Sequence, residues 1–476
     1  MLDSPALENP PPAPPSVRAN LRRRRRFLLL FLAGFSGMYF GLADRMQSAL
    51  VPEKASPAEA YFLQQTHQSR ALEVRSGLTR SLREWTPHRS DGYSNPLWPW
   101  LAARLGPELP LEQGRAFNRA LGYSFLVLFT LFLIGRGKAP LSTANLIISL
   151  ALLFVLPASL RFDPQLLFGL LLLLTWLTAV ETLKHNTLGM HLLLGFLAGL
   201  SWLAYPLITP LLGTFFLVSN LRFLQAVVKP PSATASPRRA GPWSWQNHLI
   251  GSAFLLLAFF LAIGPRLDFA QTTLGSPFAH ERGACRWTSH PEQVAAARTE
   301  EKVEASGLRH LLTQENPLAI GSRLAAGSWE IFKGWGEASD WEASLRQVPW
   351  RGLHLGLLLA ALLATAVLVK RHQPSSQLPR QRHAAEMGSI LLFTVGAFAW
   401  QNALAGWDAR LFAELPDLAA LTPAVLCSLF AGMDSLLRRF RDRGGDPRQI
   451  RFCLFFQVAF SLALAATLVH WLAVLR

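Results

Sequence analysis

Four carboxylates stand out because each lies beside a long apolar stretch or in the polar segment that follows one. They are Glu59, Asp91, Asp163 and Asp408. A carboxylate can take a proton from an attacking hydroxyl or amine. Ionisable groups at the ends of membrane spans are costly to place, so their positions carry functional information. These four residues are therefore the candidates for chemistry at a membrane face.

Two of the four have an arginine two residues away. Asp163 follows Arg161, and Asp408 precedes Arg410. On spacing alone, a local ion pair at a helix end is the simpler interpretation. What favours the functional interpretation is convergence, because one predicted face collects two long polar segments, several carboxylates and several arginines.

The elements that must position these residues are apolar runs in a chain that is 51% hydrophobic and 16% charged. Most runs have the roughly 17–25 residues needed to cross a bilayer core. We therefore expect an all-α integral membrane protein with about eleven transmembrane helices. The predicted spans are 27–43, 116–135, 141–158, 164–181, 188–204, 206–224, 248–264, 352–369, 388–405, 414–432 and 452–472.

Basic residues set the expected orientation of these spans. Most of the lysines and arginines lie in alternate connectors, beginning with Arg22–Arg26, while the short connectors of the other face carry only Arg161 and Arg410. The positive-inside rule then places the N-terminus in the cytoplasm and the C-terminus outside. It also explains the net charge of +16 without a nucleic-acid partner.

This topology divides the chain into a tail and a membrane domain. Residues 1–26 are expected to be a disordered Pro-rich and basic cytoplasmic tail, and 27–476 the multi-span domain. Two long segments, 44–115 and 265–351, would face outwards and carry juxtamembrane helices. Residues 58–83 have the composition of an amphipathic helix pair lying on the membrane surface.

The end of the first outer segment, Asp91–Trp100, should return the chain to the membrane. Asn95–Pro96 and Pro99 oppose a regular helix start, and Trp98 and Trp100 suit the membrane interface. Common soluble-enzyme motifs such as a P-loop, HExxH and GxSxG are absent from the sequence. The three cysteines imply no disulfide or thiolate metal site.

An ordered set of short motifs extends over roughly residues 27–430. These are Pro57–Phe62, Asn95–Trp98, Arg115 or Arg119 before Ala120–Gly122, Gly135–Arg136, Arg161–Pro164, Gly195–Leu200, Arg410–Phe412 and Leu415–Pro416. The set resembles the GT-C membrane glycosyltransferases, especially the bacterial branch related to aminoarabinose transferases and protein O-mannosyltransferases. Two departures stand out: Ala58 occupies the place of the family's catalytic aspartate, and Asn95–Pro96 replaces paired prolines.

The resemblance implies a GT-C-like fold in a bacterial inner membrane and a polyprenyl-phosphate-linked sugar as donor. The acceptor would be a lipid, a glycan or a protein at the outer face. The reaction would be an inverting displacement, with Glu59 as the base and Asp91 as the alternative to it. Arg115, Arg119 or Arg161 would bind the phosphate, and Asp163 would orient the acceptor or hold one of those arginines. No cofactor is firmly implied, and a divalent metal is compatible. The expected substrate-binding residues are Tyr61, Tyr93, Asn95, Arg115, Arg119, Arg161, Asp408 and Arg410.

Two other functions compete with transfer. Because Ala58 stands where the family carries its aspartate, the chain is also compatible with a catalytically degenerate scaffold that binds a partner through its outer segments. A transporter is less well supported, because the predicted span interiors hold almost no acids or bases.

Overall fold

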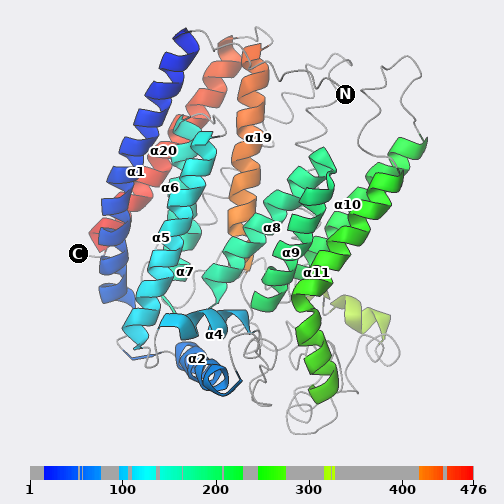
Figure 1. The fold of residues 1–476 in the computed structure, drawn as a ribbon. Helices are drawn as coiled ribbons and strands as arrows, with labels where there is room; N and C mark the ends of the chain where they lie inside the picture. The colour runs from blue at the N-terminus through cyan, green and yellow to red at the C-terminus, as the bar shows by residue number, and fades with distance from the viewer. Residues whose placement is uncertain are drawn as a thin grey trace, which may run out of the picture.

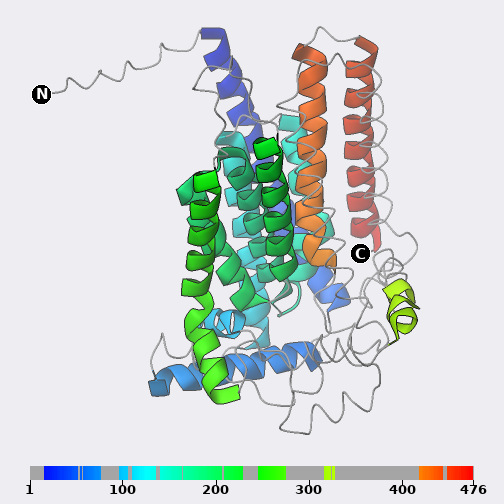
Figure 2. The same cartoon turned by 90° about the vertical axis from the view of Figure 1, so that its right-hand side faces the viewer.

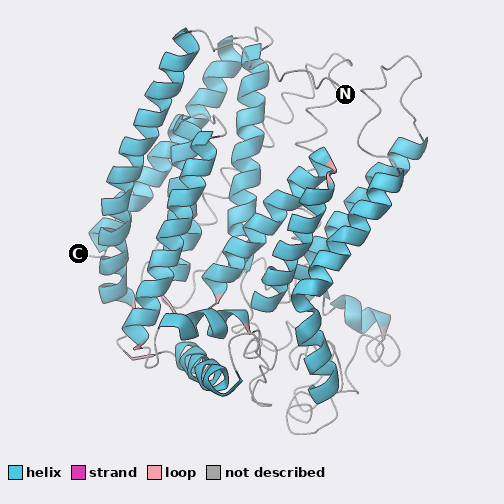
Figure 3. Cartoon of the chain, in the orientation of Figure 1, coloured by secondary structure: helices cyan, strands magenta, loops and turns pink. Residues whose placement is uncertain are grey.

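The computed structural model describes residues 15–51, 54–55, 57–76, 96–105, 110–135, 140–162, 164–205, 208–228, 245–274, 316–322, 324–326, 418–442 and 447–474. These residues form helices joined by short loops, and none of them lies in a strand (Figure 3). The expected all-α class is confirmed for this part of the chain.

The described helices form an elongated bundle with a transverse layer across one end (Figures 1 and 2). The transverse layer consists of α2 (Pro57–Ser76), α4 (Leu97–Ala102) and the single turn η1 (Ala103–Leu105). The bundle helices are α1 (Pro15–Leu50), α5 (Leu111–Gly135), α6 (Pro140–Leu150), α7 (Leu156–Ser159), α8 (Gln165–His185), α9 (Leu188–Ala204), α10 (Thr209–Val228), α11 (Trp245–Leu274), α19 (Thr422–Asp442) and α20 (Pro447–Val474).

Four helical stretches in the described residues are long and apolar enough to cross a membrane: Leu111–Leu133, Leu141–Ser159, Gln165–His185 and Asn247–Phe269. The second is 89% buried inside the bundle, whereas the first and the fourth are only 33% buried. Their outward residues, such as Leu128 and Leu261, are large and apolar. A soluble protein would not expose so much apolar surface, so the protein is membrane-associated.

The remaining predicted spans agree with the observed helices to different extents. Helices cover 27–43, 188–204, 206–224, 414–432 and 452–472 wholly or in large part. Residues 352–369 and 388–405 lie outside the described residues. Helix α1 begins at Pro15, inside the segment predicted to be a disordered tail. Proline fits the first turn of a helix, and arginine is a good helix former, so the arginine run extends the helix instead of ending it.

The third predicted span contains a wider turn at its centre. Residues Ala151–Val155 (η2) form a π-helical turn between α6 and α7, in which the Leu156 N–H donates to the Ala151 carbonyl. Pro157 explains the turn, because it has no N–H for the carbonyl of Leu153 and its ring would clash with that carbonyl in a regular α-helix. All five residues of η2 are buried.

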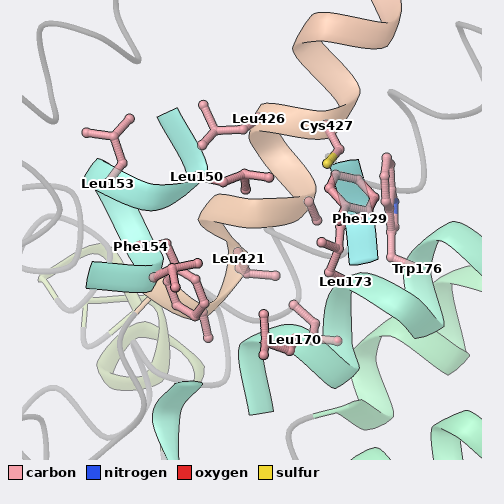
Figure 4. Packing of buried hydrophobic residues seen from close by; sticks show 14 of the residues in the cluster. Phe129, Leu150, Leu153, Phe154, Leu170, Leu173, Trp176, Leu421, Leu426 and Cys427 are labelled. Atoms are coloured by element: carbon pink, nitrogen blue, oxygen red, sulfur yellow. The ribbon is translucent and has the colours of Figure 1, made fainter. Parts of the chain in front are cut away.

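The core lies between α5, η2, α8 and α19 (Figure 4). Phe154 and Leu150 come from the third span, Trp176 and Leu173 from α8, and Cys427 from α19. Gly169 of α8 lies directly against the Phe154 ring, leaving no room for a side chain. The C-terminal helices therefore share one core with the N-terminal ones, although more than 200 residues separate them in the chain.

Helices α9 and α11 approach each other most closely through two glycines. A Cβ at Gly195 would overlap the Leu255 carbonyl oxygen, and a Cβ at Gly199 would lie 2.5 Å from the Ala262 Cβ. Small residues four apart allow backbones to pack this closely in membranes.

We predict that Gly195→Ala destabilises the protein by about 1–3 kcal/mol, because the added methyl must push α11 away. Thermal unfolding of the purified protein in detergent, followed by tryptophan fluorescence, measures the effect. Gly189→Ala is the matched control, since a Cβ there has no neighbour within 4 Å. Equal midpoints for the two variants would contradict the close packing.

Candidate functional site

The candidate site lies where the transverse layer meets the bundle. Helix α2 starts at Pro57, whose fixed backbone angle suits a first turn, and Glu59 follows in that turn, where the helix dipole favours a negative charge. The Glu59 side chain points into the protein and is only 2% exposed. A buried carboxylate requires compensating partners.

Arg115, in the first turns of α5, is the principal partner. Its Nε donates to Glu59 Oε1 and its Nη2 to Glu59 Oε2, each at 2.9 Å. Arg115 is itself 1% exposed. Two parallel N–H···O bonds are the strongest geometry for such a pair. The Glu59–Arg115 pair therefore fixes the start of α2 to the start of α5.

The connector between α7 and α8 contacts the same carboxylate. The backbone N–H of Phe162 donates to Glu59 Oε1 at 3.0 Å. The Phe162 ring packs against Gly114, where a Cβ would lie 2.6 Å from the ring, and against Trp98 of α4. The absence of a side chain at Gly114 thus lets the connector between α7 and α8 reach Glu59.

A partly exposed network surrounds the pair and reaches α1. Arg115 Nη1 donates to Glu112 Oε1 at 3.0 Å, and Glu112 Oε2 accepts from Gln47 Nε2 at 2.6 Å. One turn along α5, Arg119 pairs with Asp44 at 2.6 Å. The end of α1, the start of α5 and the transverse layer are therefore joined by charged groups.

The structure brings four of the predicted site residues to this junction. Glu59 and Arg115 contact each other directly, Arg119 lies on the next turn of α5, and the Arg161 carbonyl accepts from Asn118 Nδ2 at 2.5 Å. The backbone of Tyr61 belongs to α2. The other predicted residues lie outside the described residues: Asp91, Tyr93, Asn95, Asp163, Asp408 and Arg410.

This geometry bears on the predicted role of Glu59 as a base. Both of its oxygens already accept hydrogen bonds, and solvent hardly reaches them. Glu59 can accept a proton from a substrate only after the pair with Arg115 opens. Its role in the closed arrangement is to hold Arg115 in position.

Helix α2 also differs from the predicted membrane-surface helix. Its inward face is polar and carries Glu59, Gln65, Thr66 and Ser69, all at most 2% exposed. Its exposed face includes Val74 and Ala71. The sequence pattern of apolar residues therefore did not identify which face is buried.

The structure after Asn95 differs from the prediction that prolines oppose a helix start there. Helix α4 begins at Leu97 and contains Pro99 in its first turn. The prediction that these prolines prevent a regular helix start was wrong, because the first turn's N–H groups need no partner within the helix. Trp98, expected at the membrane interface, is 1% exposed and packs between Phe117 and Phe162.

Sequence reasoning missed several members of the network, including Gln47, Glu112 and Asn118. Glu112 had a usable signal, because it lies three residues before Arg115 and such pairs meet on a helix. Within the described residues, no group of three histidine, cysteine or acidic side chains is placed to hold a metal ion. No protein-family model matches the chain, and a search of curated proteins also found no match.

We predict that Arg115→Met lowers stability by about 3–5 kcal/mol, because it leaves the buried Glu59 carboxylate without its main partner. Replacing both residues, as Glu59→Leu with Arg115→Met, should recover much of the loss. Glu73→Gln, on the same helix as Glu59, is the control. Glu73 makes only partly exposed ion pairs with Arg70 and Arg104, and such pairs are worth about 0–1 kcal/mol. Thermal unfolding in detergent measures these variants beside Glu59→Leu alone and the wild type. A double-variant effect equal to the sum of the two single effects would show that the pair is not coupled.

Proposed function

We propose that this chain is a GT-C-type membrane glycosyltransferase with about eleven spans. It transfers a sugar from a polyprenyl-phosphate donor to a lipid, glycan or protein acceptor by inverting displacement. The observation that carries this proposal is the buried Glu59–Arg115 pair at the junction of bundle and transverse layer. Charged groups in such a place are expensive and therefore indicate function.

The arrangement suits chemistry on a lipid-linked phosphate. The transverse layer crosses the end of an apolar bundle, where the headgroup of a membrane lipid would lie (Figure 2). The same junction collects Arg115, Arg119 and Arg161. A leaving phosphate gains negative charge during transfer, and fixed guanidinium groups stabilise that charge.

The roles within the junction follow from what each side chain already contacts. Glu59 holds Arg115, so the base in this proposal is Asp91, the other carboxylate of the first outer segment. Asp91 lies outside the described residues and takes the proton of the acceptor as it attacks the sugar. Arg119 and Arg161 are the phosphate-binding candidates, and Asp163 orients the acceptor or holds one of them.

The proposed location is a bacterial inner membrane, with the N-terminus in the cytoplasm and the C-terminus outside. Helix α1 runs from the end that carries Arg22–Arg26 to the end where α2 lies (Figure 1). The positive-inside rule then places the transverse layer, and the reaction, at the outer face.

One observation favours the scaffold alternative. Glu59 is the only acidic residue left where the family carries its Asp-Glu motif, and its oxygens are taken up by Arg115 and Phe162. A chain that kept the fold and lost the base would show this geometry. The two functions differ in whether Asp91 is needed for product formation.

We predict that cells lacking the gene lose a glycan modification that mass spectrometry of the cell envelope detects. Restoring the gene should restore the modification, and Asp91→Asn should reduce transfer by about 10²–10⁴-fold, the usual contribution of a general base. Its unfolding midpoint should stay that of the wild type.

Two controls make this test decisive. Glu181→Gln replaces another acidic residue, near the end of α8 that lies away from the junction, and should leave transfer unchanged. Glu59→Gln should lower stability together with transfer. If Glu59→Gln folded normally and lost transfer while Asp91→Asn kept it, Glu59 would be the base. Identical envelope glycans with and without the gene would reject the enzyme and leave the scaffold.

A further inference from the structure

Within the part of the chain that the structure describes, four buried polar atoms of the transverse layer have no hydrogen-bond partner. They are both amide atoms of Gln65, the hydroxyl oxygen of Ser69 and the indole nitrogen of Trp98. Each of these side chains is only 1% exposed. Leaving a buried donor or acceptor unsatisfied costs about as much as a lost hydrogen bond or more, so such groups are rare and require an explanation.

These atoms belong to two helices of the transverse layer that pack against each other. Gln65 and Ser69 are four residues apart on α2, so their side chains lie on the same side of the helix. Helix α2 packs against α4, which carries Trp98. Glu59, on the same inward face of α2, holds Arg115. The unpaired groups therefore lie in the layer that contains the candidate site.

The chemistry of the four atoms specifies a type of ligand. The Gln65 amide offers both a donor and an acceptor, Ser69 offers a hydroxyl that can serve as either, and Trp98 offers a donor. None of these side chains carries a charge. A neutral ligand with several hydroxyl groups matches this set, whereas a phosphate would leave the amide oxygen facing another acceptor.

We infer that Gln65, Ser69 and Trp98 form a subsite for the sugar of the donor, beside the arginines that bind its phosphate. This inference rests on the proposed function and adds the groups that recognise the transferred sugar. Gln65 binds hydroxyls through both amide atoms, and Ser69 and Trp98 each supply one further bond. Binding of the sugar satisfies the groups that are unpaired in its absence.

A ligand-binding role for Gln65 and a purely structural role predict different effects of its replacement on the unfolding midpoint. Without ligand, Gln65→Met removes unsatisfied polar atoms and keeps a similar volume, so the unfolding midpoint should stay equal or rise. If Gln65 were hydrogen-bonded to a buried water or to another part of the chain, the same change should lower the midpoint. Gln64→Met, on the exposed side of the same helix, is the matched control.

Ligand binding supplies the second measurement. The probes are farnesyl phosphate carrying mannose, glucose or arabinose, with bare farnesyl phosphate as reference, added to the full-length protein in detergent. At least one sugar-bearing probe should raise the unfolding midpoint above the reference, because ligands stabilise the state that they bind. Gln65→Met should weaken that probe about 30-fold, the value of two lost hydrogen bonds, and leave bare farnesyl phosphate unaffected.

Three results would overturn the subsite: a lower midpoint for Gln65→Met without ligand, equal sugar-dependent stabilisation in Gln65→Met and wild type, or no sugar-dependent stabilisation by any probe. Envelope mass spectrometry reads the proposed function separately. If removing the gene abolished the glycans and Gln65→Met still bound the sugar probe like the wild type, the transferase would stand and the subsite would be rejected. If the glycans stayed the same without the gene and the protein still bound a sugar probe, the transferase would be rejected and the subsite would stand.

Discussion

The cost of burying a charge governs how this molecule is assembled at one end. Glu59 and Arg115 are each almost fully removed from solvent, and their mutual contact offsets much of the cost of burying both charges. The pair joins two helices that come from distant parts of the sequence, and the Phe162 backbone adds a third element to the same carboxylate. Stability and site geometry therefore depend on the same few atoms.

The rest of the bundle follows a different constraint. Within the described part of the chain, helices α5 and α11 expose apolar faces, while η2, α8 and α19 pack around a common core. Glycines permit close packing: Gly195 lies against the backbone of α11, and Gly169 lies against the Phe154 ring. The apolar bundle supports the junction, and the junction holds the buried charged pair.

Much of the helical framework could be predicted from the sequence, because spans of about twenty apolar residues have few alternatives to a helix in lipid. The partners of the site residues could not be predicted. Glu59 and Arg115 were each singled out, but nothing in their spacing indicates that they bind each other across 56 residues. The polar face of α2 and the burial of Trp98 arise from tertiary packing, which hydropathy patterns do not encode.

The π-helical turn at Ala151–Val155 sets the rotation, about the helix axis, of the residues that lead to the junction. Such a turn accommodates one residue more than an α-helical turn, and each residue of an α-helix rotates the chain by about 100°. Five residues of the π turn therefore rotate the chain about as far as four residues of an α-helix. If the same residues formed a regular α-helix, everything from Leu156 to Phe162 would rotate by roughly a quarter of a circle. The Phe162 N–H would then face away from Glu59, so the turn geometry deep in the apolar core determines a polar contact at its edge.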